Sequence, residues 1–203
     1  ESIYEVPVNF EREDLGSRIL EKFGLKRKTK NLEDWRRLVK VIKTVKKTVK
    51  IGIVGKYFNT GNFTLADSYI SVIEAIKHAC WHHKAKPELT WLSSEAYEKE
   101  PGKLKELKSF DGIIVPGGFG SRGVEGKIKA IEFCRKNKIP YLGLCFGLQL
   151  AVVEFARNVC KMKDAHTTEI VKNTKYPVID VMPEQKVLLR EKKYGGTMRL
   201  GEY

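Results

Sequence analysis

The residues best suited to chemistry lie in the segment Gly143-Leu144-Cys145-Phe146-Gly147. An apolar run enters this segment, and apolar residues at helical spacing leave it. The pattern predicts a strand, a tight turn and a helix, with the cysteine at the turn and glycines leaving room for it. A thiol at a helix N-terminus lies in the positive end of the helix dipole, which favours the thiolate. We therefore predict that Cys145 is a reactive nucleophile.

A second glycine-rich turn, Pro116-Gly117-Gly118-Phe119-Gly120, directly follows the apolar run at 113–115. In an open parallel sheet, sites form beyond the carboxyl ends of the strands, so both turns are expected there. Backbone N–H groups of the second turn could hold a developing oxyanion. By itself the motif also fits a plain tight turn that needs glycine. Together with the cysteine turn, it favours an oxyanion hole.

The elements that position these turns are expected from the apolar pattern. The start is expected to be extended (Ile3, Val6, Pro7, Val8), followed by helices at about 12–23 and 32–47, the second capped by Asn31. Buried strands are expected at 49–54, 113–115 and 139–144, a further strand at 88–92, and helices at 65–83, 94–108 (short pieces), 124–137 and 147–158. Shorter strands follow at 168–171, 178–182 and 186–190. This alternation predicts an α/β fold with an open, mostly parallel sheet and helices on both faces.

Composition narrows the class of protein. The formal net charge is +13, and residues 26–50 hold eleven Lys or Arg against Glu33 and Asp34, a local net of +9. We interpret the basic helix at 32–47 as a solvated face docked by its apolar stripe, with a nucleic-acid-binding helix as the weaker alternative. Four cysteines without CxxC pairing indicate free thiols in a reducing compartment. No apolar stretch is long enough to span a bilayer. We expect a cytoplasmic protein that binds neither membrane nor nucleic acid.

Histidine spacing leaves one metal question open. His78 and His82 are spaced i, i+4 near the end of an expected helix. A metal pair is the weaker alternative to solvated helix-end side chains. We predict no metal site.

The segment 143–149 resembles the nucleophile motif of class I (triad) glutamine amidotransferases. More narrowly, the stretches 54–57, 67–75, 115–126, 164–169 and 195–201 resemble the glutaminase domain of the CTP synthase family. The blocks PGGFGSRGVEG and GGTMRLG are specific to that family. The resemblance implies a flavodoxin-like amidotransferase domain at 49–203, truncated at its C-terminus. It also implies the end of a synthetase domain and a basic helical linker at 1–48.

The resemblance also implies a role for each matching residue. Cys145 attacks the side-chain amide of L-glutamine and forms a thioester with release of ammonia. The N–H groups of Gly118 and Phe146 form the oxyanion hole. The implied glutamine-binding residues are Gly118, Phe119, Gln149 and Glu169, and the implied GTP effector residues are Arg122, Gly123, Glu125 and Arg199.

The same resemblance implies cofactors and partners. The ammonia serves an ATP-dependent amination of UTP to CTP, and GTP acts as an effector. No Gly-x-x-x-x-Gly-Lys-Ser/Thr motif occurs in these 203 residues. The resemblance implies that ATP with Mg²⁺ belongs to the synthetase domain, which we expect to be absent here. No cofactor is expected in the glutaminase domain. The implied protein partners are the chain's own synthetase domain and further copies in a homotetramer of the full-length enzyme.

One departure from the family bears on activity. The family's general base is a histidine in a His-x-Glu pair near the end of the domain, and no such pair occurs in these 203 residues. His166 replaces the usual asparagine and comes in the wrong order for a base. We therefore expect this chain to be inactive by itself. Two alternatives stay open: another cysteine-nucleophile amidotransferase or peptidase of this fold, and a catalytically silent interaction domain.

Overall fold

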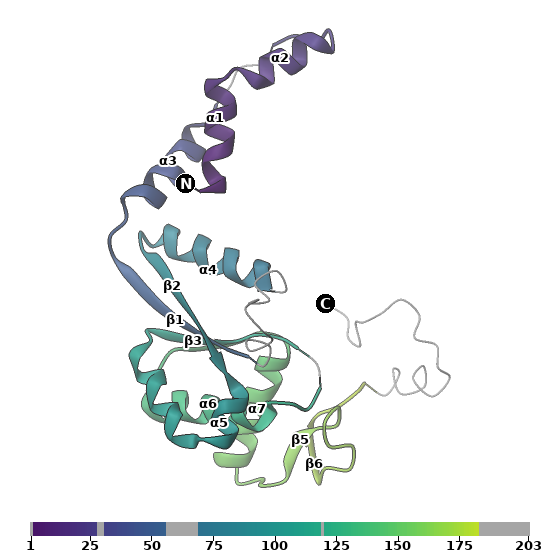
Figure 1. The fold of residues 1–203 in the computed structure, drawn as a ribbon. Helices are drawn as coiled ribbons and strands as arrows, with labels where there is room; N and C mark the ends of the chain where they lie inside the picture. Colours follow the sequence, from purple (N-terminus) through teal and green to yellow (C-terminus); the bar gives the residue numbers. More distant parts are fainter. Residues whose placement is uncertain (1, 28–30, 56–68, 119, 183–203) are drawn as a thin grey trace. The chain divides into compact units, whose positions relative to one another are not determined.

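The structure is a computed structural model that describes residues 2–27, 31–55, 69–118 and 120–182 (Figure 1). The chain divides into two compact units, which we describe separately. The first comprises Glu1–Val49 and Ser71–Pro87, and the second comprises Lys50–Ile70 and Glu88–Tyr203. The strand predicted at 186–190 lies outside the described residues, as do residues 65–68 of the predicted helix 65–83. The predicted domain boundary after residue 48 stays a prediction.

Helices make up most of the first unit. They are the 3₁₀ helix η1 (Ile3–Glu5), α1 (Val6–Arg12), α2 (Leu15–Lys22), α3 (Glu33–Thr44) and most of α4 (Ile70–His82). The predicted extended start is wrong because Ser2 and Glu5 form a reciprocal capping box. Pro7 also lies in the first turn of α1, where its lack of an N–H group costs no helical hydrogen bond. The single helix predicted at 12–23 is interrupted at Asp14, whose φ of 56° is left-handed.

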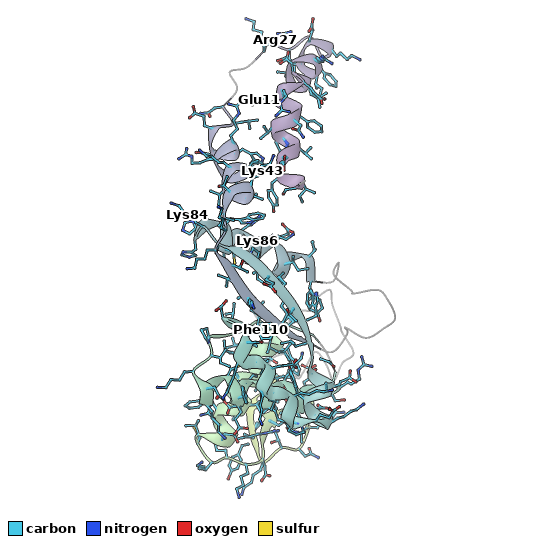
Figure 2. The ribbon with its side chains drawn as sticks, turned by 60° about the vertical axis from the view of Figure 1, so that its left-hand side comes forward. Glu11, Arg27, Lys43, Lys84, Lys86 and Phe110 are labelled. Atoms are coloured by element: carbon cyan, nitrogen blue, oxygen red, sulfur yellow. The ribbon has the colours of Figure 1, made fainter. Side chains whose placement is uncertain are left out.

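The helix α3 is held by its apolar stripe, as the sequence predicted. The Trp35 Nε1 atom donates a hydrogen bond of 2.6 Å to the Tyr4 carbonyl, and the two rings stack. Its basic side chains instead pair with acidic groups near the surface. The Lys43 Nζ atom lies 2.5 Å from the Glu5 carboxylate, and Arg36 pairs with Glu11. Figure 2 shows Lys43 and Glu11 among the side chains of this unit. Part of the local positive charge is therefore paired within the unit.

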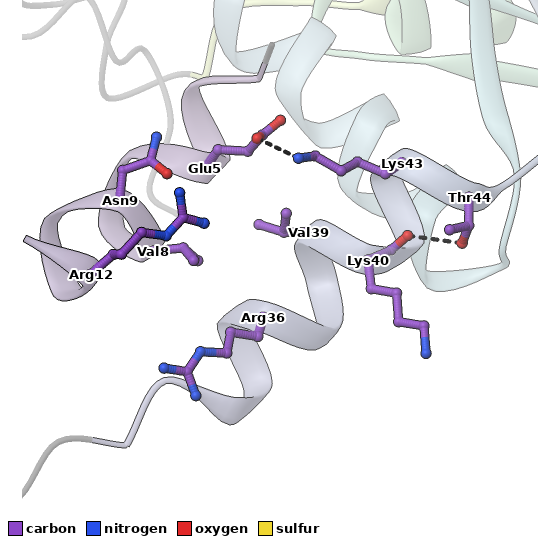
Figure 3. Close-up of a pocket in the computed structure, with 9 residues that line it drawn as sticks. All are labelled: Glu5, Val8, Asn9, Arg12, Arg36, Val39, Lys40, Lys43 and Thr44. Atoms are coloured by element: carbon purple, nitrogen blue, oxygen red, sulfur yellow. Dashed lines mark hydrogen bonds and ion pairs between the residues drawn. The ribbon is translucent and has the colours of Figure 1, made fainter.

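A cavity of about 310 Å³ lies between α1 and α3 (Figure 3). The Glu5–Lys43 ion pair crosses one side of it, and Val8 and Val39 give it an apolar portion. None of its nine lining residues is a cysteine or a histidine. The cavity therefore cannot carry the thiol chemistry that the sequence predicted.

The second unit alternates strands and helices. Its elements are β1 (Thr48–Gly55), β2 (Lys86–Ser93), α5 (Ser94–Lys99), the 3₁₀ helix η3 (Pro101–Ser109), β3 (Gly112–Val115), α6 (Val124–Asn137), β4 (Tyr141–Gly143), α7 (Phe146–Asn158), β5 (Ala165–Thr167) and β6 (Tyr176–Ile179). The first two strands begin in the other unit. Most predicted elements are present, with shifted ends. The strand predicted at 168–171 is wrong: the N–H groups of Ile170 and Val171 donate to the Thr167 carbonyl, which closes a turn.

The main sheet has the strand order β2-β1-β3-β4. β3 pairs in parallel with β1 on one side and with β4 on the other. Ile113, Val115, Leu150 and Val153 are almost fully buried in the core between the sheet and its helices. This arrangement confirms the predicted α/β fold. Because the order reverses between β1 and β3, a switch point lies beside the carboxyl end of β3, where ligands bind in such sheets.

Candidate active site

Cys145 lies at the junction of β4 and α7, at the N-cap position of the helix. Its φ of 50° and ψ of −111° are strained for a residue with a side chain, and it is exposed. The Leu144 N–H donates to the Val115 carbonyl at 3.0 Å, which ties the turn to β3. The turn therefore presents the thiol above the sheet, the geometry of a nucleophile elbow.

Glycines allow the elbow to close against its neighbours. A Cβ on Gly143 would lie 2.6 Å from the Gly147 backbone, and a Cβ on Gly147 would lie 2.0 Å from the Val115 carbonyl oxygen. Both contacts are shorter than carbon and oxygen atoms tolerate. The glycines flanking Cys145 are therefore required by close packing of backbone on backbone.

The two glycine-rich turns meet, as the sequence predicted. A Cβ on Gly117 would lie 3.3 Å from the Cys145 Cβ and 3.7 Å from its Sγ. The next residue, Gly118, has a φ of 151°. Phe146 begins α7, where first-turn N–H groups have no intrahelical acceptor. Backbone donors of Gly118 and Phe146 can therefore serve an oxyanion formed at Cys145. Phe119, predicted to bind glutamine, lies outside the described residues.

The elbow is supported by two side chains that the sequence analysis did not predict. The Tyr141 hydroxyl donates a hydrogen bond of 2.8 Å to the Gly147 carbonyl, and burial raises the pKa of this phenol. Lys127 of α6 is 2% exposed, with its Nζ 5.5 Å from the centre of the Phe146 ring. A cation beside an aromatic ring is favourable when both are removed from water. Neither residue belongs to a local motif, so only the contacts in the folded chain reveal their roles.

The predicted effector segment is fixed by helix α5. The Arg122 Nε atom lies 2.9 Å from the Glu95 carboxylate. Gly123 is the N-cap of α6, with a φ of 74°, and a Cβ on it would lie 2.3 Å from the Ser94 Oγ. Glu125 pairs with Arg157 of α7. Arg199, the fourth predicted effector residue, lies outside the described part of the chain.

The predicted glutamine-binding side chains come from two other elements. Gln149 is half-buried in the first turn of α7, where its N–H donates to the Cys145 carbonyl at 3.1 Å. Glu169 is exposed in the turn after β5, and its N–H donates to the Thr167 Oγ1 at 3.2 Å. Their predicted roles, like those of the effector residues, stay predictions.

His166 lies in β5 with both ring nitrogens engaged. Its Nδ1 accepts a hydrogen bond of 2.9 Å from the Thr167 N–H, and its Nε2 lies 3.6 Å from the Glu125 carboxylate. These partners indicate a neutral ring with the proton on Nε2. Burial and the Arg157 charge lower the pKa of His166 below its ordinary 6.5, although Glu125 opposes the shift.

This lowered pKa predicts an acid-sensitive stability. Below about pH 6.5 the unfolded chain binds a proton at this histidine more readily than the folded chain, so stability falls as the pH falls. Urea unfolding is measured at pH 7.5 and pH 5.5. The free energy of unfolding should fall less between the two pH values in the variant His166→Asn than in the unmodified chain. The exposed His83 provides the matched control, His83→Asn. Equal losses in all three proteins would contradict the prediction.

Other classes of site receive no support from the described residues. Among them, no group of three or more His, Cys, Asp or Glu side chains could hold a metal ion. The His78 Nε2 lies 2.5 Å from the Tyr4 hydroxyl, and the His82 ring packs against His83. In the same part of the chain, no helix has the length and apolar content needed to cross a bilayer.

Comparisons with known proteins agree with this geometry. Residues 64–194 match the family model described as glutamine amidotransferase class-I. The chain belongs to the class I glutamine amidotransferases. The match includes Cys145, both glycine-rich turns and β5, and it confirms the resemblance found in the sequence.

Several relatives of this amidotransferase have the more specific name CTP synthase. The chain is 51% identical to a CTP synthase of Pyrococcus furiosus and 50% identical to one of Pyrococcus abyssi, over its whole length. It spans 36% of the length of each. A solved structure titled as the Trypanosoma brucei CTPS glutaminase domain with bound acivicin is 37% identical, with a TM-score of 0.61 over 66% of this chain and 50% of that one.

Proposed function

We propose that this chain is the glutaminase part of a CTP synthase. The observation that carries the proposal is the elbow at Cys145, which lies against the Gly117-Gly118 turn. The identity of about 50% to CTP synthases over the whole chain supports the narrower assignment. The ammonia released here then serves the ATP- and Mg²⁺-dependent amination of UTP in the synthetase part. Assembly into a homotetramer and activation by GTP belong to the same proposal.

The chemistry is an acyl transfer to sulfur. The Cys145 Sγ attacks the side-chain carbonyl carbon of glutamine, and the carbonyl oxygen becomes an oxyanion held by the N–H groups of Gly118 and Phe146. The C–N bond then breaks, the nitrogen takes up the proton that the thiol lost and leaves as ammonia, and a glutamyl thioester remains. Water hydrolyses the thioester to glutamate and restores the thiol. We do not assign His166 as the base, because its Nδ1, the nitrogen with a free electron pair, already accepts the hydrogen bond from the Thr167 N–H.

The glutamine itself needs groups that hold its amino-acid end. The exposed Glu169 carboxylate suits the substrate ammonium group, and the half-buried Gln149 lies one helical turn from the thiol. Gly118 and Phe119 complete the proposed binding set. Arg122, Gly123, Glu125 and Arg199 form the proposed GTP-responsive segment.

Site-resolved labelling tests the proposed glutaminase site. Acivicin, an electrophilic analogue of glutamine, is added to a protein that carries this chain together with the family's His-x-Glu pair, and the modified cysteine is located by peptide mass spectrometry. Cys160 is also exposed and provides an internal control, whereas Cys80 and Cys134 are buried. We expect acivicin to modify Cys145 alone, with protection by L-glutamine, and iodoacetamide to modify both exposed thiols. Equal acivicin labelling of Cys145 and Cys160, or labelling that glutamine does not slow, would overturn the proposal.

A further inference from the structure

A cluster of three charged or titratable side chains, Glu125, Arg157 and His166, joins α6, α7 and β5. The Arg157 Nη1 atom, in the last turn of α7, lies 3.1 and 3.0 Å from the two carboxylate oxygens of Glu125 in the first turn of α6. The Arg157 Nε donates a 2.7 Å hydrogen bond to the Ala165 carbonyl of β5. One guanidinium thus connects three elements.

The geometry of the guanidinium explains why this residue can make both contacts. Its planar group donates in several directions at once, whereas a lysine ammonium is a single point charge on a flexible stem. The Arg157 side chain is 18% exposed and that of Glu125 is 52% exposed. The pair is therefore partly solvated, and its contribution to stability is expected to be modest. Its geometric effect on β5 is the larger consequence.

The fixed strand leads directly to a proposed substrate contact. His166 binds the Thr167 N–H, and the Thr167 Oγ1 accepts from the N–H of Glu169. The Thr168 N–H donates to the Ile179 carbonyl of β6 at 3.0 Å, which holds the other side of this turn. Glu169 is exposed. Its position follows from the backbone that precedes it, which Arg157 holds at Ala165.

We propose that Glu125 and Arg157 form a positioning pair that places Glu169 and thereby sets the affinity for the amino-acid end of glutamine. This inference rests on the proposed glutaminase function. Glu125, which the sequence suggested for effector binding, thus acts within the chain through Arg157. Neither residue touches the reacting atoms, so the pair changes binding rather than the attack by Cys145.

The rate of acivicin labelling at Cys145, measured against acivicin concentration, separates binding from chemistry. For Arg157→Gln we expect the half-saturating concentration to rise about 10-fold and the limiting rate to stay within about 2-fold, since misplacing one contact weakens binding. Arg157→Lys keeps the charge but cannot contact both Glu125 and the Ala165 carbonyl, so it should recover only part of the affinity. In a double-mutant cycle, Glu125→Gln should add little to Arg157→Gln, because the two substitutions break one contact.

A matched control separates positioning from general destabilisation. The Arg135 Nη2 lies 2.6 Å from the Glu154 carboxylate and also joins α6 to α7, but within the described residues it makes no hydrogen bond or ion pair with β5. Arg135→Gln should lower the melting temperature and leave the half-saturating concentration unchanged. The inference is overturned if Arg157→Gln binds acivicin like the unmodified protein, or if Arg135→Gln weakens binding equally. If the unmodified protein shows no saturable labelling at Cys145, the proposed function fails instead.

Discussion

In a protein that carries this chain together with the family's His-x-Glu pair, Cys145→Ala is expected to lower glutamine hydrolysis by about 10⁴-fold or more, because the proposed thioester forms on the Cys145 sulfur. Its effect on stability should be small. The side chain is exposed, and removing the sulfur creates no internal cavity. Alanine still has a Cβ, so the strained backbone at φ 50° stays strained. The measurement is ammonia release from L-glutamine, with the melting temperature recorded in parallel.

The control for this experiment is the second exposed thiol. Cys160→Ala removes a sulfur of similar exposure just after α7 and should leave ammonia release unchanged. Full glutaminase activity in Cys145→Ala would exclude the thioester mechanism. Loss of activity in both variants would point instead to a general effect of thiol removal.

Gly147→Ala is expected to abolish the elbow by steric overlap. The new Cβ would lie 2.0 Å from the Val115 carbonyl oxygen and 2.9 Å from its carbonyl carbon. Both are backbone atoms of a fully buried strand residue, and a side-chain rotation cannot relieve the clash. The helix α7 must move away from β3, which breaks core packing and costs about 3 kcal/mol or more. Urea unfolding measures the loss, and acivicin labelling of Cys145 should fall with it.

Gly16→Ala is the matched control for this substitution. Gly16 lies in α2, and a Cβ there would meet no atom within 4 Å. Alanine is favoured over glycine inside a helix by about 0.5–1 kcal/mol, so this variant should be as stable as the unmodified protein or slightly more so. A Gly147→Ala protein with unchanged unfolding and labelling would show that α7 does not need its close approach to β3.

Local sequence patterns predicted the elements of the second unit well. The apolar run at 113–115 and the helical spacing at 124–137 and 147–158 match β3, α6 and α7 closely. Strong periodicity and glycine at the turns leave few alternatives for such segments. Errors occurred where a few polar atoms decide the conformation. The capping box of Ser2 and Glu5 makes the apolar start helical, and the left-handed backbone at Asp14 interrupts the helix predicted at 12–23.

The β5 region shows a different kind of error. Residues 168–171 have strand-like composition, but two of their N–H groups bond to Thr167, and β5 forms three residues earlier. Strand propensity depends on what the strand packs against, and no local pattern carries that information. Here β5 is anchored by Arg157 from the end of α7, a contact that spans eight residues and two elements.

The sequence alone determined the α/β order and the positions of the two glycine-rich turns, and it predicted the nucleophile, because each depends on residues adjacent in the chain. It also indicated the family, because each family motif is a short contiguous block of residues. The tertiary structure decided which groups hold these turns: the Val115 carbonyl under Gly147, the Tyr141 hydroxyl, the buried Lys127 and the Glu125–Arg157 pair. These partners lie far from Cys145 or Glu169 in sequence, or on other elements. Only packing in three dimensions brings them within a few ångströms.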